Sequence, residues 1–209
     1  MDKRAMYDLS YGLFVVTANV DGRDNGCITN TVQQVTTEPN QISVAINKAN
    51  LTHDMVMESR KLTVSIIDQN ASFSLFQHFG FQSGKSVDKF AGFADAKRVD
   101  NGTMVITKGC NAYISAWVTN TVDLGTHTLF IATVTNCEKL EDVPSATYAY
   151  YQSNIKPKPA KPAQAEAGKA VWRCSVCGYV YEGDPIPADF VCPLCKHPAS
   201  DFEREVVGG

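Results

Sequence analysis

The sequence predicts a mainly β protein with one barrel-like domain and a second, very small domain built around a metal ion. Three observations lead to this prediction. Short segments rich in β-branched and aromatic residues fill the longer N-terminal part of the chain, a stretch rich in proline and lysine follows, and two Cys-x-x-Cys pairs stand near the C-terminus. Many short strands with few helices favour a closed or nearly closed barrel. A length of 209 residues leaves room for one medium domain and one small domain.

The expected strands are short and lie between turn residues such as Asp21-Gly22 and Leu124-Gly125. Their valine, isoleucine, threonine and aromatic side chains pack well on a pleated surface, so these residue types are enriched in strands. Phe14, Tyr113 and Trp117 lie in these strands and are expected in the core. The expected strands cover residues 13–20, 41–46, 61–67, 112–118 and 128–134.

Two short helices are expected between the strands. Thr52 can cap the first of them with its hydroxyl, and this helix then continues to Ser59. The second helix is expected at residues 72–78. Because both are short, the strands remain the main elements of the domain.

Three polar clusters in this domain are candidates for binding an anion. Residues 26–31 are rich in hydroxyls and backbone donors, residues 47–53 place a lysine just before a helix N-terminus, and residues 80–90 hold two lysines between aromatic residues. Lysines and helix N-termini attract phosphate groups because they present positive charge to the ligand. No Gly-x-Gly-x-x-Gly follows a strand and no Walker loop occurs, so a Rossmann nucleotide site is not expected.

Taken together and in this order, the clusters resemble the flavin-reductase-like family of split β-barrel proteins that bind FMN. The resemblance covers essentially all of residues 1–153 and implies a Greek-key split barrel with short helices. It also implies a homodimer in which FMN lies at the subunit interface. The matching segments are residues 11–17, 26–31, 47–53, 83–90 and 123–130.

The resemblance assigns residues to the phosphate end of FMN. Lys48, Thr52 and His53 would hold the phosphate, and Lys89 would add a positive charge near the phosphate or the ring. A dianionic phosphate suits this combination of lysine, hydroxyl and helix N-terminus. The alternative is that the two lysines are solvated charges and that His53 is a structural histidine.

The other contacts implied by the resemblance surround the flavin ring and its ribityl chain. The polar side chains of residues 29–31 would line the ring and the chain, and an aromatic residue at 148–151 would cover the ring. His127 would approach the ring from the barrel; the alternative is that His127 is a structural histidine. The expected contacts are Thr29, Asn30, Thr31, Asn47, Ser83, His127 and Tyr151.

Residues 154–170 change abruptly to lysine, proline and alanine and form a linker. Nothing in this segment could form a core, so we expect a semi-rigid, solvated tether. Extended as polyproline II, it would span on the order of 50 Å, at about 3.1 Å per residue. Such a tether would let the small domain at residues 171–209 visit more than one docking surface, although a passive spacer would have the same composition.

Cys174, Cys177, Cys192 and Cys195 form two Cys-x-x-Cys pairs separated by fourteen residues. Two such hairpins can point four thiolates at one tetrahedral ion, which replaces the core that so short a segment cannot build. Iron would make the segment an electron carrier, and zinc would make it a structural ribbon.

Residues 172–185 resemble rubredoxin, in the compact form found in rubrerythrin-type proteins, and this resemblance favours one iron ion over zinc. Gly178 would adopt the positive φ that turns backbone N–H groups toward sulfur. An aromatic shell would exclude water from the metal and tune its properties. The expected shell comprises Trp172, Tyr179, Tyr181, Phe190 and Phe202.

Composition and the pattern of the sequence argue against a nucleic-acid partner, a membrane association and a disulfide framework. A formal charge of −3 gives no surplus of lysine and arginine, so nucleic acid is not an expected partner. The N-terminus lacks a signal-peptide pattern and no segment approaches bilayer length, so no membrane association is expected. Seven cysteines without a secretory signal indicate reduced thiols in the cytoplasm, and Cys27, Cys110 and Cys137 are expected to be small buried residues.

The two resemblances together imply an electron-transfer oxidoreductase. NADH or NADPH gives two electrons as hydride, a one-iron centre accepts one electron, and flavin handles both. FMN N5 would accept the hydride, and no side chain is expected to act as a catalytic acid or base. The combination is similar to the high-molecular-weight rubredoxins of anaerobes, whose implied partner is a flavodiiron protein that reduces nitric oxide or dioxygen.

Two other functions remain open from the sequence. The chain could be a flavin reductase that releases reduced FMN to a separate oxygenase, with a zinc ribbon for docking. It could also be a non-enzymatic carrier that moves electrons between other proteins and never meets nicotinamide.

Overall fold

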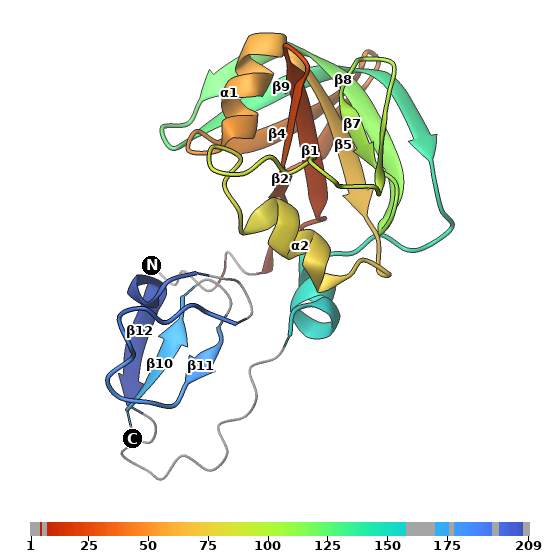
Figure 1. The fold of residues 1–209 in the computed structure, drawn as a ribbon. Helices are drawn as coiled ribbons and strands as arrows, with labels where there is room; N and C mark the ends of the chain where they lie inside the picture. The colour runs from red at the N-terminus through yellow and green to blue at the C-terminus, as the bar shows by residue number, and fades with distance from the viewer. Residues whose placement is uncertain (1–4, 6–7, 158–169, 176–177, 194–196, 207–209) are drawn as a thin grey trace. The chain divides into compact units, whose positions relative to one another are not determined.

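The computed structural model describes residues 5, 8–157, 170–175, 178–193 and 197–206. The chain divides into two compact units, Met1–Ile155 and Lys156–Gly209. In the described residues, the first unit holds a seven-stranded sheet and the α-helices, and the second holds a sheet of three strands (Figure 1). None of the described helices is both long and apolar enough to cross a membrane.

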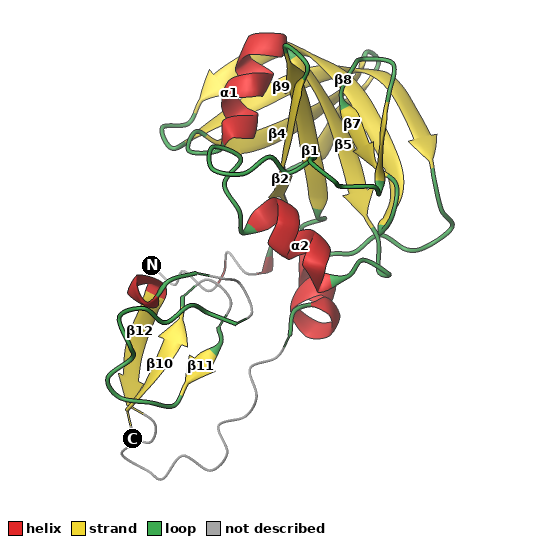
Figure 2. Ribbon diagram, in the orientation of Figure 1, coloured by secondary structure: helices red, strands yellow, loops and turns green. Residues whose placement is uncertain are grey.

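The first unit is a split β-barrel with short helices, which confirms the expected fold class (Figure 2). Its sheet has the order β2-β1-β5-β8-β9-β4-β3, and each neighbouring pair is antiparallel. The strands are β1 Phe14–Val20, β2 Arg23–Thr29, β3 Gln33–Thr37, β4 Asn40–Asn47, β5 Lys61–Ile67, β8 Cys110–Asp123 and β9 His127–Lys139. A separate pair is formed by β6 Ala96–Arg98 and β7 Met104–Ile106. The helices are α1 Leu51–Ser59, α2 Phe73–Gly80 and α3 Tyr148–Tyr150, and a π-helical turn, Tyr151–Ile155, follows α3.

The turn at Asp21-Gly22 explains how the barrel begins. Both residues have positive φ, 49° and 83°, and they join Val20 directly to its partner Arg23. A two-residue loop with positive φ at both positions is the type I′ turn, whose twist matches that of a hairpin. The turn therefore folds the polar segment Arg23–Thr29 back onto β1 as strand β2, which the residue types alone did not predict.

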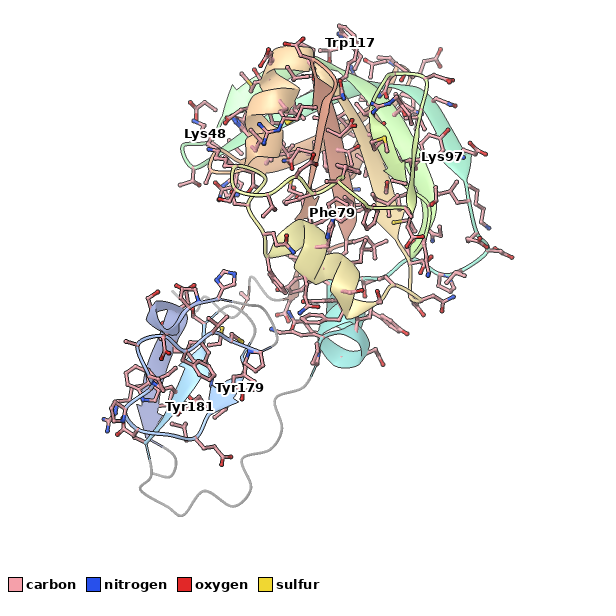
Figure 3. All side chains as sticks on the ribbon, in the orientation of Figure 1. Lys48, Phe79, Lys97, Trp117, Tyr179 and Tyr181 are labelled. Atoms are coloured by element: carbon pink, nitrogen blue, oxygen red, sulfur yellow. The ribbon has the colours of Figure 1, made fainter. Side chains whose placement is uncertain are left out.

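Strand β1 supplies both halves of the core, because successive side chains of a strand point to opposite faces. Val16 packs with Val44 and Val118 in one buried cluster. Its neighbour Val15 packs with Ile67 and Phe79 in the other. Helix α2 contributes Phe79 to this second cluster, beside strand β2 (Figure 3). Burial on both faces accounts for the uninterrupted apolar start of β1.

The prediction that Trp117 lies in the core is wrong, whereas Phe14 and Tyr113 are buried as expected. Trp117 is 47% exposed, at the outside of the barrel (Figure 3). Its neighbours Ala116 and Val118 both point into the core, so strand alternation turns the indole outward. The ammonium of Lys61 lies 5.7 Å from the centre of the ring.

The first helix is not capped by Thr52 as we expected. Asn50 is the N-cap residue, and Thr52 lies inside the first turn with its side chain fully buried. The Thr52 hydroxyl is occupied in the core, where it accepts a 2.9 Å hydrogen bond from Asn25 Nδ2. The second helix, α2, follows Ser72 and agrees with the prediction to within two residues.

Cys27 and Cys110 are buried as expected, but Cys137 is exposed. The reason lies in the pairing of β9. Strand β4 covers β9 only from His127 to Thr133, so the last residues of β9 extend past this neighbour and pair with β8 alone. Cys137 belongs to this overhanging segment.

The sheet has two edges in the described residues, formed by β2 and β3. All five residues of β3 are exposed. Its pairing with β4 is interrupted by a bulge between Gln34 and Thr36. The strand is therefore short, polar and irregular.

The second unit contains the strands β10 Ala170–Cys174, β11 Val180–Tyr181 and β12 Phe202–Val206, in the order β11-β10-β12. A 3-10 turn, Ala199–Asp201, precedes β12. Two ion pairs bind its strands and loops together, one between Arg173 and Glu205 and one between Arg204 and Asp184. Both ion pairs are partly exposed, and the rings of the unit pack together in a cluster described below.

Candidate functional site

A small cavity of about 150 Å³ lies where β2 and β4 end and β9 begins. Five of the residues expected to contact flavin line it, namely Thr29, Asn30, Thr31, Asn47 and His127. The pairing of β4 with β9 explains part of this grouping, because Asn47 and His127 are directly opposite each other across the two strands. Polar side chains from three separate segments of the sequence therefore meet at one place.

The two threonines of this cavity are held by the strands around them. The Thr31 hydroxyl donates to the carbonyl of Ala45 at 2.8 Å and lies 2.7 Å from the Thr29 hydroxyl. The backbone N–H of Ala45 in turn donates to Thr31 Oγ1 at 3.1 Å. These bonds fix the segment after β2 against β4. The cavity wall is therefore set by the sheet before any ligand binds.

The cavity is also lined by Cys27 and Asn50, which lie within the candidate segments 26–31 and 47–53 but were not named as flavin contacts. Asn50 could have been found, because asparagine is a preferred N-cap residue and the segment before the helix was already a candidate site. Cys27 lay in a candidate segment too, but we expected it to be a small buried residue, as a lone cysteine in a strand most often is.

The cavity is smaller than the pockets of about 300–1,000 Å³ that typically enclose a small molecule. A cofactor the size of a flavin nucleotide would therefore extend beyond it. Only part of such a ligand would be in contact with Thr29, Asn30 and His127.

Lys48 and His53, expected at the phosphate end, lie outside the lining of this cavity and have partners of their own. Lys48 Nζ donates to Asp123 Oδ1 at 2.7 Å. This bond, with a second from the backbone of Gly125, holds the pKa of the Asp123 carboxyl below its usual value. His53 is buried, with its two ring nitrogens 2.9 Å from Asp54 Oδ1 and Thr128 Oγ1.

Ser83 and Tyr151 are placed elsewhere in the barrel unit. Ser83 is exposed and accepts a hydrogen bond from the backbone of Lys85. Tyr151 is buried in the second core cluster, where its ring centre is 4.4 Å from that of Phe76. The structure does not bring these two residues to the cavity, and their contact with flavin stays a prediction.

Lys89 is almost completely buried, at 3% exposed, and contacts the backbone of β2. Its ammonium donates to the carbonyl of Gly26 at 2.8 Å and to the carbonyl of Phe79 at 2.9 Å. Burial lowers the pKa of Lys89 from its ordinary value, and burial raises the pKa of the nearby Cys27 thiol. The lysine thus ties the loop at residues 83–90 to β2 and to the end of α2.

Two of the four cysteines predicted to bind the metal lie within the described residues. Cys174 and Cys192 are buried in the second unit, and Cys177 and Cys195 lie outside the described residues. Gly178 has a φ of 78°, as expected, and its N–H donates to the carbonyl of Cys174 at 2.8 Å. The N–H of Cys192 donates to the carbonyl of His197 at 2.8 Å. In the described part of the chain, His, Cys, Asp and Glu do not form a group of three or more that could hold an ion.

Four of the five aromatic residues expected around the metal form a cluster of rings, and two of them, Tyr179 and Phe202, pair with Cys174 through the backbone. The ring of Phe190 lies 4.6 Å from Tyr181, 6.3 Å from Tyr179 and 5.5 Å from Phe202, centre to centre. Figure 3 labels both tyrosines on the small unit. Trp172, the fifth expected member, donates its indole N–H to Asp184 at 3.2 Å.

Comparison with known proteins identifies the family of each unit. Residues 6–158 match the model of the flavin reductase like domain, so the chain belongs to that family. Residues 172–203 match the rubredoxin-like domain of rubrerythrin. The protein is therefore a flavin reductase-like barrel fused to a rubredoxin-like domain.

Two curated relatives and one solved structure illustrate the similarity. The high molecular weight rubredoxin of Moorella thermoacetica is 35% identical, over 98% of this chain and 100% of the relative. The ferric-chelate reductase (NAD(P)H) of Archaeoglobus fulgidus is 39% identical, over 78% of this chain and 96% of the relative. The structure of the flavin reductase PheA2 in its native state has a TM-score of 0.59 and 29% identity, over 70% of this chain and 93% of that one.

The residues present fit the groups that these relationships imply. Hydroxyl, amide and imidazole groups line the cavity, and such groups suit the polar edge of a flavin ring and the hydroxyls of its side chain. In the second unit, two buried thiols lie at the ends of hydrogen-bonded turns beside an aromatic cluster, which suits a thiolate-bound ion.

Proposed function

We propose that this chain is an NAD(P)H-oxidising electron-transfer oxidoreductase that uses FMN and one iron ion. The observation that carries the proposal is the presence, in one chain, of a flavin reductase-like barrel and a rubredoxin-like unit. A full-length relative with the name high molecular weight rubredoxin supports it. When bound, flavin accepts two electrons as hydride and releases them singly, and a one-iron centre can carry single electrons onward.

In this proposal the chain's own residues position the cofactors. Thr29, Asn30, Thr31 and His127 hold one edge of the flavin in the cavity at the ends of β2 and β4. The phosphate end extends beyond the cavity toward Lys48, whose ammonium would exchange Asp123 for phosphate. The second barrel of a homodimer completes the site.

The four cysteines of the two Cys-x-x-Cys pairs hold the iron, and the aromatic cluster around Phe190 keeps water away from it. The electron acceptor in our proposal is a separate redox protein of the flavodiiron type. The Pro/Lys/Ala composition of residues 154–170 supports this choice, because an extended linker of that composition would give a carrier domain reach toward a separate protein.

An anaerobic titration of the full chain with NADH, followed by visible absorbance, tests the proposal. Flavin bands and ferric-thiolate bands should both disappear as NADH is added. The matched control is Cys174→Ser, which removes one buried ligand and should leave the flavin reducible while the ferric bands are absent.

Three results would overturn the proposal in different ways. A flavin band with zinc in place of iron would indicate a flavin reductase with a structural ribbon. Flavin and iron that both fail to respond to NADH and to NADPH would indicate a carrier with another donor. Flavin that bleaches while ferric iron stays oxidised would show that electrons do not pass between the two centres.

A further inference from the structure

A second cavity, of about 380 Å³, opens at the end of the barrel where β1 and β4 begin and β9 ends. Strand β4 covers β9 only as far as Thr133, so the later residues of β9 pair with β8 alone. Val134 and Cys137 belong to this uncovered part of β9, and both line the cavity. The other lining residues in the described part of the chain are Phe14, Val32, Gln33, Gln34, Asn40, Ile42 and Ile114.

The walls of this cavity are largely apolar. Phe14 and Ile42 are buried in the first core cluster. Val32, Ile114 and Val134 pack against the same cluster but are only partly buried, and all three line the cavity. An apolar ligand would remove this remaining aliphatic surface from water, which is favourable. Phe14 also offers a ring against which an aromatic ligand could pack.

The polar groups of the cavity are neutral. Gln33, Gln34 and Asn40 are exposed amides, and Gln34 Nε2 donates to Asn40 Oδ1 at 3.0 Å. Cys137 adds an exposed thiol. None of the described lining residues carries a charge. A charged ligand would lose hydration here without gaining a partner of opposite charge, so the site favours a neutral molecule.

The volume of the cavity sets the size of its ligand. An apolar cavity of about 150 Å³ can hold benzene, and this cavity is more than twice as large. It lies within the range of about 300–1,000 Å³ that is typical of small-molecule sites, which often occur in the mouths of β-barrels. It shares no described lining residue with the smaller, polar cavity assigned to flavin.

We propose that this end of the barrel binds a small, uncharged aromatic molecule of one or two rings. The rings would lie against Val32, Ile114 and Val134, and a hydroxyl or carbonyl group of the ligand would bond to the amides of Gln33 or Asn40. Because Cys137 is both exposed and a lining residue, its thiol would lose access to solvent when the ligand binds. This site is separate from the proposed flavin site and does not depend on it.

The test uses 2-naphthol as the probe and compares Val134→Phe with Val35→Phe in the full chain. Val134 lines the cavity, whereas Val35 is 45% exposed on β3 and is not a lining residue, so the second variant makes the same enlargement outside the site. Isothermal titration calorimetry gives the dissociation constant of 2-naphthol for each chain, with and without bound FMN. Far-UV circular dichroism checks that each variant is folded.

Val134→Phe should weaken the binding of 2-naphthol by at least about tenfold, because the added ring occupies space that the probe needs. Val35→Phe should keep the affinity of the unmodified chain, and bound FMN should leave it unchanged. Naphthalene-2-sulfonate should bind more weakly than 2-naphthol, because no described lining residue is a cation. Equal affinities in all three chains, tighter binding of the sulfonate, or competition between 2-naphthol and FMN would overturn the inference.

The thiol of Cys137 keeps the inference testable if Val134→Phe does not fold. In the unmodified chain, saturating 2-naphthol should slow the labelling of Cys137 by a thiol reagent several-fold, as measured by peptide mapping. Unchanged labelling would place the probe elsewhere and contradict the inference. A Cys137 thiol that is unreactive before any probe is added would show that another surface, such as a second copy of the chain, covers the cavity, and this too would overturn the inference.

Discussion

Replacing Gly84 by alanine should destabilise the barrel, because the new methyl group would collide with a buried hydrogen bond. A Cβ atom added at Gly84 would lie 2.6 Å from Asn25 Cγ, far closer than real contacts. Asn25 is 2% exposed, so its amide has no room to move aside. That amide donates to the buried hydroxyl of Thr52 at 2.9 Å and joins β2 to α1.

The size of the effect follows from what the collision breaks. Displacing the amide leaves the Thr52 hydroxyl and the Asn25 amide without a buried partner, which costs about 1–3 kcal/mol in the free energy of unfolding. For a domain of this size, each kcal/mol changes the melting temperature by about 2–4 °C. We therefore expect Gly84→Ala to melt roughly 2–12 °C below the unmodified chain.

Thermal unfolding of the barrel can be followed by the fluorescence of Trp117 in a Trp172→Phe background, since the chain has two tryptophans. The matched control is Gly80→Ala, whose added Cβ has its nearest contact at an ordinary 3.6 Å, from Ile28 Cδ1. Alanine at this helical position should leave the melting temperature equal or higher, because glycine is the poorer helix former.

A double-mutant cycle with Asn25→Ala separates the collision from other effects. Once the asparagine amide is absent, Gly84→Ala has nothing to displace and should cost little. If Gly84→Ala melts with the unmodified chain, or costs the same with and without Asn25, the reasoning is wrong.

Three further predictions concern single groups. The Asp123 carboxyl, whose pKa is lowered by Lys48, contributes stability that is present above its unfolded pKa of about 3.9 and is lost as the pH falls through the lower folded value. In an NMR titration, Lys48→Met should raise the Asp123 pKa toward the ordinary value, and an unchanged pKa would argue against the ion pair. A thiol reagent should label the exposed Cys137 in the native chain but label the buried Cys27 only after unfolding, which peptide mapping can show. Equal labelling rates for the two thiols would contradict the burial of Cys27. His127→Ala should weaken FMN binding about tenfold in a fluorescence titration, the equivalent of one hydrogen bond, and unchanged affinity would exclude His127 from the site.

The strands that the sequence predicted are those whose side chains face a core. Strands β1 and β5 are rich in β-branched residues and bury most of them, so composition alone identifies them. Strand β2 was missed because its Arg-Asp-Asn-Gly start is polar, and it becomes a strand through the tight turn that pairs it with β1. Strand β3 was missed because no face of it is buried.

Five lining residues of the cavity could be predicted from the topology of the barrel rather than from their residue types. The segments at residues 29–31 and 47, together with His127, meet because neighbouring strands end at the same place, and this convergence needs only the correct barrel topology. The roles of Lys48 and Lys89 depend on where each long side chain points. Lys48 turns to Asp123 and Lys89 turns inward to two carbonyls, and neither direction is encoded in the local sequence pattern.

The form of β3 has a consequence for the behaviour of the protein in concentrated solution. An open sheet edge offers unpaired backbone groups to which a strand of another molecule could add, the first step toward fibrous aggregation. Here the edge strand spans five residues, is bulged between Gln34 and Thr36, and carries mainly glutamine and threonine. An approaching strand would find few backbone groups in register and little apolar surface, so the form of β3 disfavours the addition of a second molecule at this edge.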